Sequence, residues 1–173
     1  MSSFDSVTHC IFDMDGLLIN TEDLYTIAYE TVLKRYNREY TFEVKAKLMG
    51  RKPLIAAEIL INELNLKDVC TPQSYIDEVS KEYPLLFPTA SILPGVEKLI
   101  NHLKAHKIPI GISTGSSNEA FDIKSTNLKP FFAKFDFILK CGSDPEVKEG
   151  KPAADAFTVA QTRFNPTPDG KLF

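Results

Sequence analysis

Tryptophan is absent from the 173 residues, and cysteine and histidine each occur only three times. The cysteines, Cys10, Cys70 and Cys141, are odd in number and far apart, which argues against a disulfide framework or a cysteine-rich metal site. No apolar run approaches the roughly 20 residues that span a bilayer. The first residues resemble neither a signal peptide nor a transit peptide. We therefore expect reduced thiols, a cytoplasmic location and no membrane partner.

The sequence also lacks an excess of positive charge. It has 20 Lys and Arg residues against 23 Asp and Glu, for a net charge of −3, and its basic residues are scattered. This pattern argues against nucleic-acid binding, which needs a clustered basic surface. A small anionic metabolite remains a plausible partner, because a local site can be positive on an acidic protein. With 43% hydrophobic and 25% charged residues, the composition is that of a globular protein, which we expect to be a monomer.

Three short apolar segments, at residues 8–13, 108–113 and 135–139, have the composition of buried strands. Helical patterns begin near Gly95, Ser117 and Lys151. The alternation of strands and helices predicts an α/β fold with a parallel sheet.

The stretch between the first two strands is much longer than the roughly 30 residues of a simple strand–helix–strand unit. Residues 17–89 have only helix and turn signals, with starts near Thr21, Thr41, Pro53 and Thr71. The last of these helices is predicted to run through Tyr83 and to end at Pro84. We therefore expect an α/β core of residues 1–16 and 90–173, with an all-helical cap of residues 17–89 inserted into it.

Two carboxylates follow the first predicted strand, in the segment Asp13-Met14-Asp15-Gly16. Ligands of parallel sheets bind beyond the carboxyl ends of the strands, which is where these residues fall. A carboxylate can attack a phosphoryl group, so Asp13 is a candidate nucleophile. Asp15 is a candidate general acid and base. Because two carboxylates repel a phosphate, we expect Mg²⁺ at Asp13 and Asp15. The alternative is an ordinary surface turn.

Further candidates for phosphate binding fall at the same predicted edge. Thr114 and Gly115 follow the second strand and precede a helix, where hydroxyl and N–H groups can bind an anion. The alternative is a helix N-cap at Ser116 or Ser117. Lys151 follows the third strand and can contribute a positive charge. In the cap, Arg51 and Lys52 either contact an anionic substrate or form a solvated pair.

Three of these segments resemble motifs of the haloacid dehalogenase superfamily, which has a Rossmann-like core. They are Phe12-Asp13-Met14-Asp15-Gly16-Leu17-Leu18, Ser113-Thr114-Gly115 and Gly150-Lys151-Pro152. The resemblance implies that Asp13 is the nucleophile, that Asp15 is the acid and base, and that the Asp15 carbonyl helps to hold Mg²⁺. The helical insertion is similar to the small cap of one subgroup.

Within the superfamily, the resemblance is greatest to the pseudouridine-5′-phosphatase group, which implies hydrolysis of a small phosphomonoester. It is carried by Leu48-Met49-Gly50, Leu93-Pro94-Gly95-Val96, Asp144-Pro145-Glu146-Val147 and Thr162-Arg163-Phe164. A phosphosugar phosphatase and a β-phosphoglucomutase-like phosphomutase share the same core and cap and remain alternatives.

The sequence departs from the superfamily pattern at two places. Asn20 stands where the subgroup has Asp, and either residue can cap a helix. The fourth motif, an acidic pair after a further strand, is not found: Asp169-Gly170 precedes the apolar segment Leu172-Phe173 instead of following it. From the sequence we therefore expect a core that lacks its last strand and helix, with weak or no activity. A non-catalytic, shortened form is a further alternative.

Overall fold

The computed structural model describes residues 8–168. The expectations for Asp169-Gly170 and for a strand at residues 171–173 lie outside the described residues. The chain divides into two compact units. One unit holds the residues up to Thr21 together with those from Ala90 onward, and the other is Glu22–Thr89. Residues 17–21, which the sequence assigns to the insertion, belong to the first unit.

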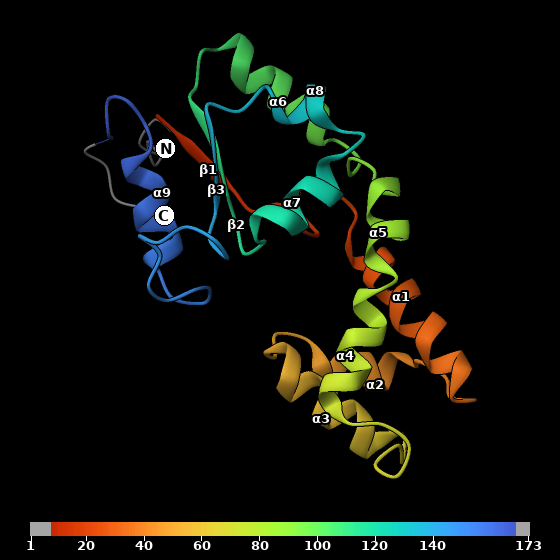
Figure 1. Ribbon diagram of the computed structural model, residues 1–173. Helices are drawn as coiled ribbons and strands as arrows, with labels where there is room; N and C mark the ends of the chain where they lie inside the picture. The colour runs from red at the N-terminus through yellow and green to blue at the C-terminus, as the bar shows by residue number, and fades with distance from the viewer. Residues whose placement is uncertain (1–7, 169–173) are drawn as a thin grey trace, which may run out of the picture. The chain divides into compact units, whose positions relative to one another are not determined.

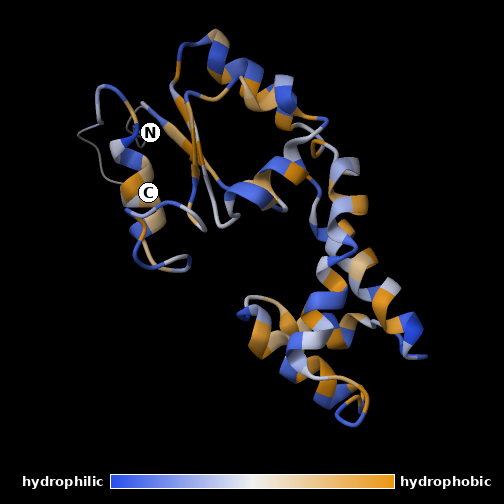
Figure 2. Ribbon diagram, in the orientation of Figure 1, coloured by the Kyte–Doolittle hydropathy of each residue, from blue (hydrophilic) through white to orange (hydrophobic). Residues whose placement is uncertain are grey.

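The first unit is built on a parallel sheet, which confirms the α/β fold class. Its strands in the described part of the chain are β1 (Cys10–Phe12), β2 (Ile110–Thr114) and β3 (Phe137–Lys140), in the order β1-β2-β3. Cys10 pairs with Ile110, and Gly111 pairs with Phe137. Figure 2 shows the strands as mostly hydrophobic, as expected for a sheet covered on both faces.

Helices cover both faces of this sheet. α9 (Asp155–Thr162) lies on one side, and α6 (Val96–Ala105), α7 (Asn118–Ser125) and α8 (Lys129–Phe132) lie on the other (Figure 1). The side chains that fill these layers are fully buried, among them Ile100, Ile110 and Ile112. The helix predicted from Lys151 begins only at Asp155. The proline at position 152 disfavours the helical conformation at Lys151 alone.

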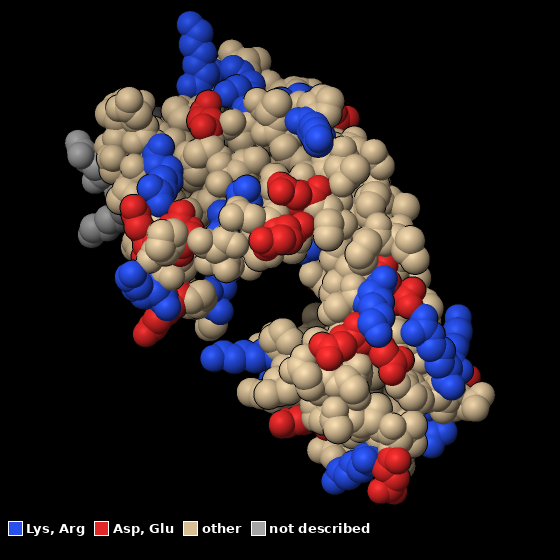
Figure 3. All heavy atoms as spheres, viewed as in Figure 1, with Lys and Arg blue, Asp and Glu red and all other residues tan. Residues whose placement is uncertain are grey.

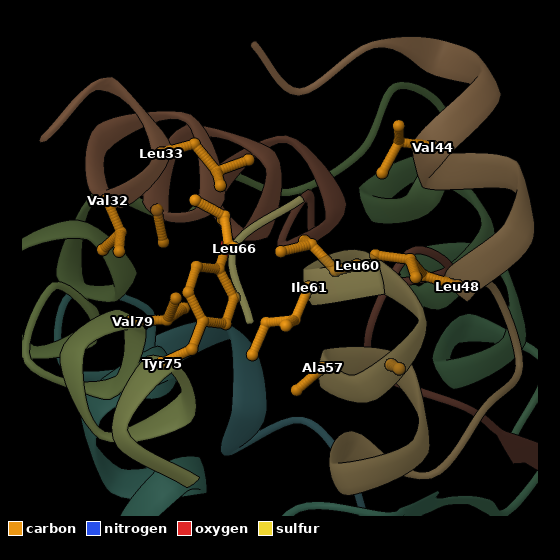
Figure 4. Packing of buried hydrophobic residues seen from close by; sticks show 12 residues of the cluster. Val32, Leu33, Val44, Leu48, Ala57, Leu60, Ile61, Leu66, Tyr75 and Val79 are labelled. Carbon is orange, nitrogen blue, oxygen red and sulfur yellow. The ribbon is translucent and has the colours of Figure 1, made fainter. Parts of the chain in front are cut away.

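The second unit is all-helical, as predicted for the insertion. It consists of α1 (Glu22–Arg35), α2 (Phe42–Leu48), α3 (Pro53–Glu63), α4 (Pro72–Ser80), α5 (Tyr83–Leu86) and the short 3₁₀ helix η1 (Phe87–Thr89). Helices start after Thr41 and Thr71, as predicted, and both threonines are N-caps whose side chains accept a hydrogen bond from the first turn of the helix that follows. Figure 4 shows the buried centre of the unit, where the Tyr75 ring lies beside Leu66 and Ile61.

Some predicted details of this unit are wrong. The apolar pattern after Pro53 predicts that Ile55 faces inward, but its side chain is 46% exposed, and Ala56 and Ala57 are buried instead. Pro84 does not end α4, which stops at Ser80. Pro84 lies in the first turn of α5. Backbone N–H groups in a first turn have no partner within the helix, so the N–H that proline lacks costs no hydrogen bond. The first error is a shift of one residue along a short helix, whose few turns define a buried face poorly, and the second misplaces the end of α4 by three residues.

Within residues 8–168, no helix is both long enough and apolar enough to cross a membrane. Figure 3 shows acidic and basic side chains interspersed on the visible face of each unit.

Candidate active site

The loops that follow the three strands meet at one edge of the sheet. Asp13 comes directly after β1, Thr114 is the last residue of β2, and Lys151 follows β3. Two backbone hydrogen bonds join the loop after β3 to the loop after β2: the Cys141 N–H donates to the Thr114 carbonyl at 2.8 Å, and the Gly142 N–H donates to the Ser116 carbonyl at 3.2 Å. The residues predicted for the core site are therefore brought together by the strand order alone.

Asp13 and Lys151 form an ion pair at this edge. The Lys151 Nζ lies 2.6 Å from Asp13 Oδ1 and donates to the Ser113 carbonyl at 2.8 Å. The Asp13 side chain is 40% exposed, so one face of the carboxylate remains open to solvent. Lys151 also lies over the Phe157 ring, 4.9 Å from its centroid. These contacts hold the ammonium beside the candidate nucleophile, where it can also bind a phosphate oxygen.

Asp15 accepts hydrogen bonds from four side chains. Its Oδ1 contacts the Lys124 Nζ at 2.7 Å and the Thr21 hydroxyl at 2.8 Å. Its Oδ2 contacts the hydroxyls of Ser116 at 3.3 Å and Thr114 at 3.4 Å. Lys124, Thr21 and Ser116 were not predicted as neighbours of Asp15. A lysine on a helix is usually solvated, so residue type alone gives no signal for Lys124.

The loop after β2 contains both a helix N-cap and candidate phosphate ligands, the two alternatives that the sequence left open. Ser117 is the N-cap of α7, because its side chain accepts from the Ala120 N–H at 3.2 Å. The Thr114 hydroxyl accepts from the Ser116 N–H at 3.1 Å, and Gly115 is exposed between these residues. The alternative of a helix cap is therefore correct for Ser117, and it leaves Thr114 and Gly115 in place as candidate phosphate ligands.

Gly142 is a further site residue that the sequence did not reveal. A Cβ at this position would lie 2.9 Å from both the Gly115 carbonyl oxygen and the Ser117 nitrogen. Contacts this short do not occur, so only glycine allows the loop after β3 to pack against Gly115. Gly142 thereby fixes the position of the candidate phosphate-binding loop.

The residues available for a metal are few and chemically uniform. No group of three or more His, Cys, Asp or Glu side chains that could hold a metal occurs among residues 8–168. The Asp13 carboxylate and the Asp15 carbonyl are both hard oxygen donors. Mg²⁺ prefers such donors and usually binds one or two protein carboxylates together with water and substrate phosphate. The donor set therefore fits Mg²⁺ better than a softer transition metal.

The helical unit has a cavity of its own, with a volume of about 460 Å³. Its lining includes Arg51 and five tyrosines, namely Tyr25, Tyr29, Tyr40, Tyr75 and Tyr83. Lys52 is exposed one residue away and does not line the cavity. Arg51 and Lys52, which the sequence did not distinguish, therefore differ in the structure, because only Arg51 lines the cavity.

Three tyrosines of this cavity have raised pKa values. Burial, reinforced by neighbouring tyrosines, raises the pKa of Tyr75, Tyr40 and Tyr83 above the ordinary value. The Tyr75 side chain is almost completely buried, and its hydroxyl has no hydrogen-bond partner among the described residues. A buried hydroxyl without a hydrogen-bond partner is unfavourable, so this group lowers the stability of the helical unit.

Comparison with known proteins gives the family. A sequence model described as haloacid dehalogenase-like hydrolase matches residues 10–172. The mitochondrial (DL)-glycerol-3-phosphatase 1 of Arabidopsis thaliana is 42% identical over 163 residues, which are 94% of this chain and 54% of that protein. A probable pseudouridine-5′-phosphatase of Drosophila melanogaster is 37% identical over 162 residues, covering 94% of this chain and 69% of that protein.

Similarity of structure agrees with similarity of sequence. The crystal structure of a putative β-phosphoglucomutase from Thermotoga maritima superposes with a TM-score of 0.72 at 26% identity, covering 91% of this chain and 70% of that one. The expected likeness to pseudouridine-5′-phosphatases is present, but the Arabidopsis glycerol-3-phosphatase is more similar in sequence. The motifs at Asp13, Thr114 and Lys151, the parallel sheet with its helical insertion and the match over residues 10–172 place the chain in the haloacid dehalogenase-like hydrolase family.

Proposed function

We propose that the protein is a phosphatase that hydrolyses a small phosphomonoester through an aspartyl-phosphate on Asp13. The observation that carries this proposal is the arrangement at the sheet edge, where Asp13 is paired with Lys151 and Asp15 is hydrogen-bonded to Thr114. A nucleophile, a cation and a proton-exchanging group are the components that phosphoryl transfer requires. The glycerol-3-phosphatase and pseudouridine-5′-phosphatase names of the relatives agree with it. The chain spans only 54% of the length of the (DL)-glycerol-3-phosphatase. We therefore propose the activity of the whole protein, and do not infer it from this relative.

In the first step, an Asp13 carboxylate oxygen attacks phosphorus while the ester P–O bond breaks. Asp15, in its protonated form, gives its proton to the departing alcohol oxygen. Lys151 and the Thr114 hydroxyl hold the phosphoryl oxygens. In the second step, a water molecule attacks phosphorus, the Asp13–phosphorus bond breaks and the water proton passes to Asp15. The sum is one ester and one water converted to one alcohol and one phosphate.

The Asp13 carboxylate and the Asp15 carbonyl would hold Mg²⁺, together with a phosphate oxygen and water. When bound, the ion neutralises charge that would otherwise make the phosphate and the Asp13 carboxylate repel each other. Lys151 contributes to the same neutralisation from the protein itself, since its ammonium lies 2.6 Å from Asp13.

We propose that the cavity of the helical unit contributes to substrate preference, and that a nucleoside suits it better than glycerol. Its five tyrosines offer aromatic faces for stacking and hydroxyls for hydrogen bonds, which a planar base with polar edges would use. A pyrimidine nucleoside monophosphate such as pseudouridine 5′-monophosphate is the first candidate. Glycerol 3-phosphate is the second, supported by the 42% identity to a (DL)-glycerol-3-phosphatase.

The test is release of inorganic phosphate from pseudouridine 5′-monophosphate, uridine 5′-monophosphate, glycerol 3-phosphate and β-glucose 1-phosphate, with and without Mg²⁺. We expect Mg²⁺-dependent release, fastest from a nucleoside monophosphate, and loss of activity with a chelator. If glycerol 3-phosphate is hydrolysed faster than the nucleoside monophosphates, it becomes the preferred substrate candidate in place of pseudouridine 5′-monophosphate. Conversion of glucose 1-phosphate to an isomer without phosphate release would identify a phosphomutase and overturn the proposal.

A further inference from the structure

Lys124 is a buried lysine in contact with the candidate acid and base. Its side chain is 2% exposed, and its Nζ lies 2.7 Å from Asp15 Oδ1 and 3.1 Å from the Ser116 hydroxyl. Lys124 lies seven residues beyond Ser117, the N-cap of α7, which is two helical turns along the same face. The side chain can therefore reach back to the loop that begins the helix.

A lysine at this position is not explained by stability. Removing an ammonium and a carboxylate from water costs several kcal/mol per ion, and an apolar pair of similar volume is often as stable. Leucine or methionine would fill this face of α7 and leave Asp15 to its three hydroxyl neighbours. An ionic group at such a position fixes the geometry of the group that it contacts, and here that group is Asp15.

The two oxygens of Asp15 are held differently. Oδ1 has the shorter contacts, at 2.7 Å to Lys124 and 2.8 Å to Thr21. Oδ2 has the longer contacts, at 3.3 Å to Ser116 and 3.4 Å to Thr114. A charge-assisted contact to an ammonium is stronger than one to a hydroxyl, and a hydroxyl can rotate to donate elsewhere. Oδ1 is therefore fixed, whereas Oδ2 is held by weaker and replaceable donors on the side of Thr114.

We infer that Lys124 is a positioning residue that fixes Asp15 Oδ1, so that Oδ2 is the oxygen that exchanges the proton with the departing alcohol and with water. This inference rests on the proposed function, because it assigns a role within that reaction. Oδ2–H gives its proton to the ester oxygen as the P–O bond breaks, and Oδ2 takes a proton from water in the second step. Lys124 itself touches neither substrate nor phosphate and transfers no proton.

The test compares two esters that differ in their need for an acid. 4-Nitrophenyl phosphate has a leaving group that departs as a stable anion, whereas glycerol 3-phosphate needs its alkoxide protonated. Well-placed general acids contribute about 10²–10⁴-fold, so Lys124→Met should lower kcat/KM for glycerol 3-phosphate by about 100-fold or more. For 4-nitrophenyl phosphate, kcat/KM should fall by less than about 10-fold, because the first chemical step needs no acid there.

Two further measurements separate positioning from a general structural effect. In Lys124→Ala, added propylammonium replaces the deleted atoms and should restore hydrolysis of glycerol 3-phosphate, whereas tetramethylammonium, which has no N–H donor, should not. Phe121→Leu on the same helix is the matched control. Phe121 is buried and packs against Phe132, so the variant loosens α7 without touching Asp15. It should lower the melting temperature but leave the ratio of the two kcat/KM values unchanged.

The outcomes distinguish the inference from the function on which it rests. If the wild-type protein hydrolyses neither these two esters nor a nucleoside monophosphate, the proposed function fails and the role of Lys124 fails with it. If the wild-type protein is active and Lys124→Met lowers both kcat/KM values by the same factor, the proposed function stands and the positioning role is overturned. Selective loss with glycerol 3-phosphate and rescue by propylammonium alone would establish it.

Discussion

The two units differ in the kind of polar group that each one holds. In the α/β unit, charged groups meet at the sheet edge and are paired, Asp13 with Lys151 and Asp15 with Lys124. In the helical unit, the lining of the cavity includes five tyrosines beside Glu22, Lys45 and Arg51, and burial raises the pKa of Tyr75 and Tyr83. Fixed charges suit the stabilisation of a phosphoryl group, and aromatic groups suit the recognition of an uncharged ring. We propose that phosphoryl transfer depends on the first unit and substrate preference on the second.

The largest effect is expected from Asp13→Asn, which removes the nucleophile from the charged edge. Turnover of every phosphomonoester should fall by about 10³-fold or more, because no alternative route to the aspartyl-phosphate remains. The amide has nearly the shape of the carboxylate, so the thermal melt should stay within a few degrees of the wild type. Near-normal turnover with any ester would show that Asp13 is not the nucleophile. It would also contradict the assignment of the chemistry to the charged edge of the sheet.

Gly111→Ala should destabilise the α/β unit without changing any charged group. A Cβ on Gly111 would lie 2.2 Å from Cζ of Phe137, so the Phe137 ring would have to leave its edge contact with Phe164. Overpacking of this kind costs about 1–3 kcal/mol, which urea unfolding would measure. Gly150→Ala is the control, because a Cβ there would meet nothing within 4 Å. Equal stability of the two variants would show that the Phe137 ring moves freely.

Arg51→Ala should change selectivity rather than chemistry. Arg51 is exposed and lines the cavity, whereas its exposed neighbour Lys52 does not, which makes Lys52→Ala the matched control. We expect Arg51→Ala to shift the preference between nucleoside monophosphates and 4-nitrophenyl phosphate by about 5-fold, the value of an exposed charge contact. Lys52→Ala should leave the preference unchanged. An equal fall of both activities in Arg51→Ala would give Arg51 a structural role instead.

Tyr75→Phe should have the smallest effect on folding. Its hydroxyl has no hydrogen-bond partner among the described residues, so removing it should leave the free energy of unfolding unchanged or raise it by up to about 1 kcal/mol. Tyr36→Phe is the control, since the Tyr36 hydroxyl donates to Glu78 Oε1 at 2.5 Å and its loss should be destabilising. Urea unfolding of the two variants measures both effects. A loss of stability in Tyr75→Phe as large as that in Tyr36→Phe would show that the Tyr75 hydroxyl has a hydrogen-bond partner.

The sequence predicted the fold class and the placement of Asp13, Thr114 and Lys151, because these depend on a simple rule. Residues at the carboxyl ends of parallel strands share one edge, so strand segments found from apolar composition locate them. This rule does not apply to Arg51 and Lys52, so the sequence did not show which of them lines the cavity. They lie in the helical unit, where packing among several helices decides which side chains border the cavity.

Lys124 and Gly142 were not predicted, for different physical reasons. The role of Lys124 depends on how α7 is rotated against the loop before it, and residue type favours solvent for a lysine. The need for glycine at position 142 comes from the approach of two loops that are distant in sequence. The roles assigned to the site residues, the requirement for Mg²⁺ and the missing fourth motif remain predictions.

The ion pairs at the sheet edge join residues that are far apart along the chain, and this has a consequence for how the protein folds. Lys151 and Asp13 are separated by 138 positions, and Lys124 and Asp15 by 109. Contacts of such long sequence separation form slowly, because a large loop must close before they contribute any stability. The helices of Glu22–Thr89 make contacts over shorter separations. The inserted unit should therefore acquire structure first, and Asp13 and Asp15 should gain their lysine partners only in the last stage of folding.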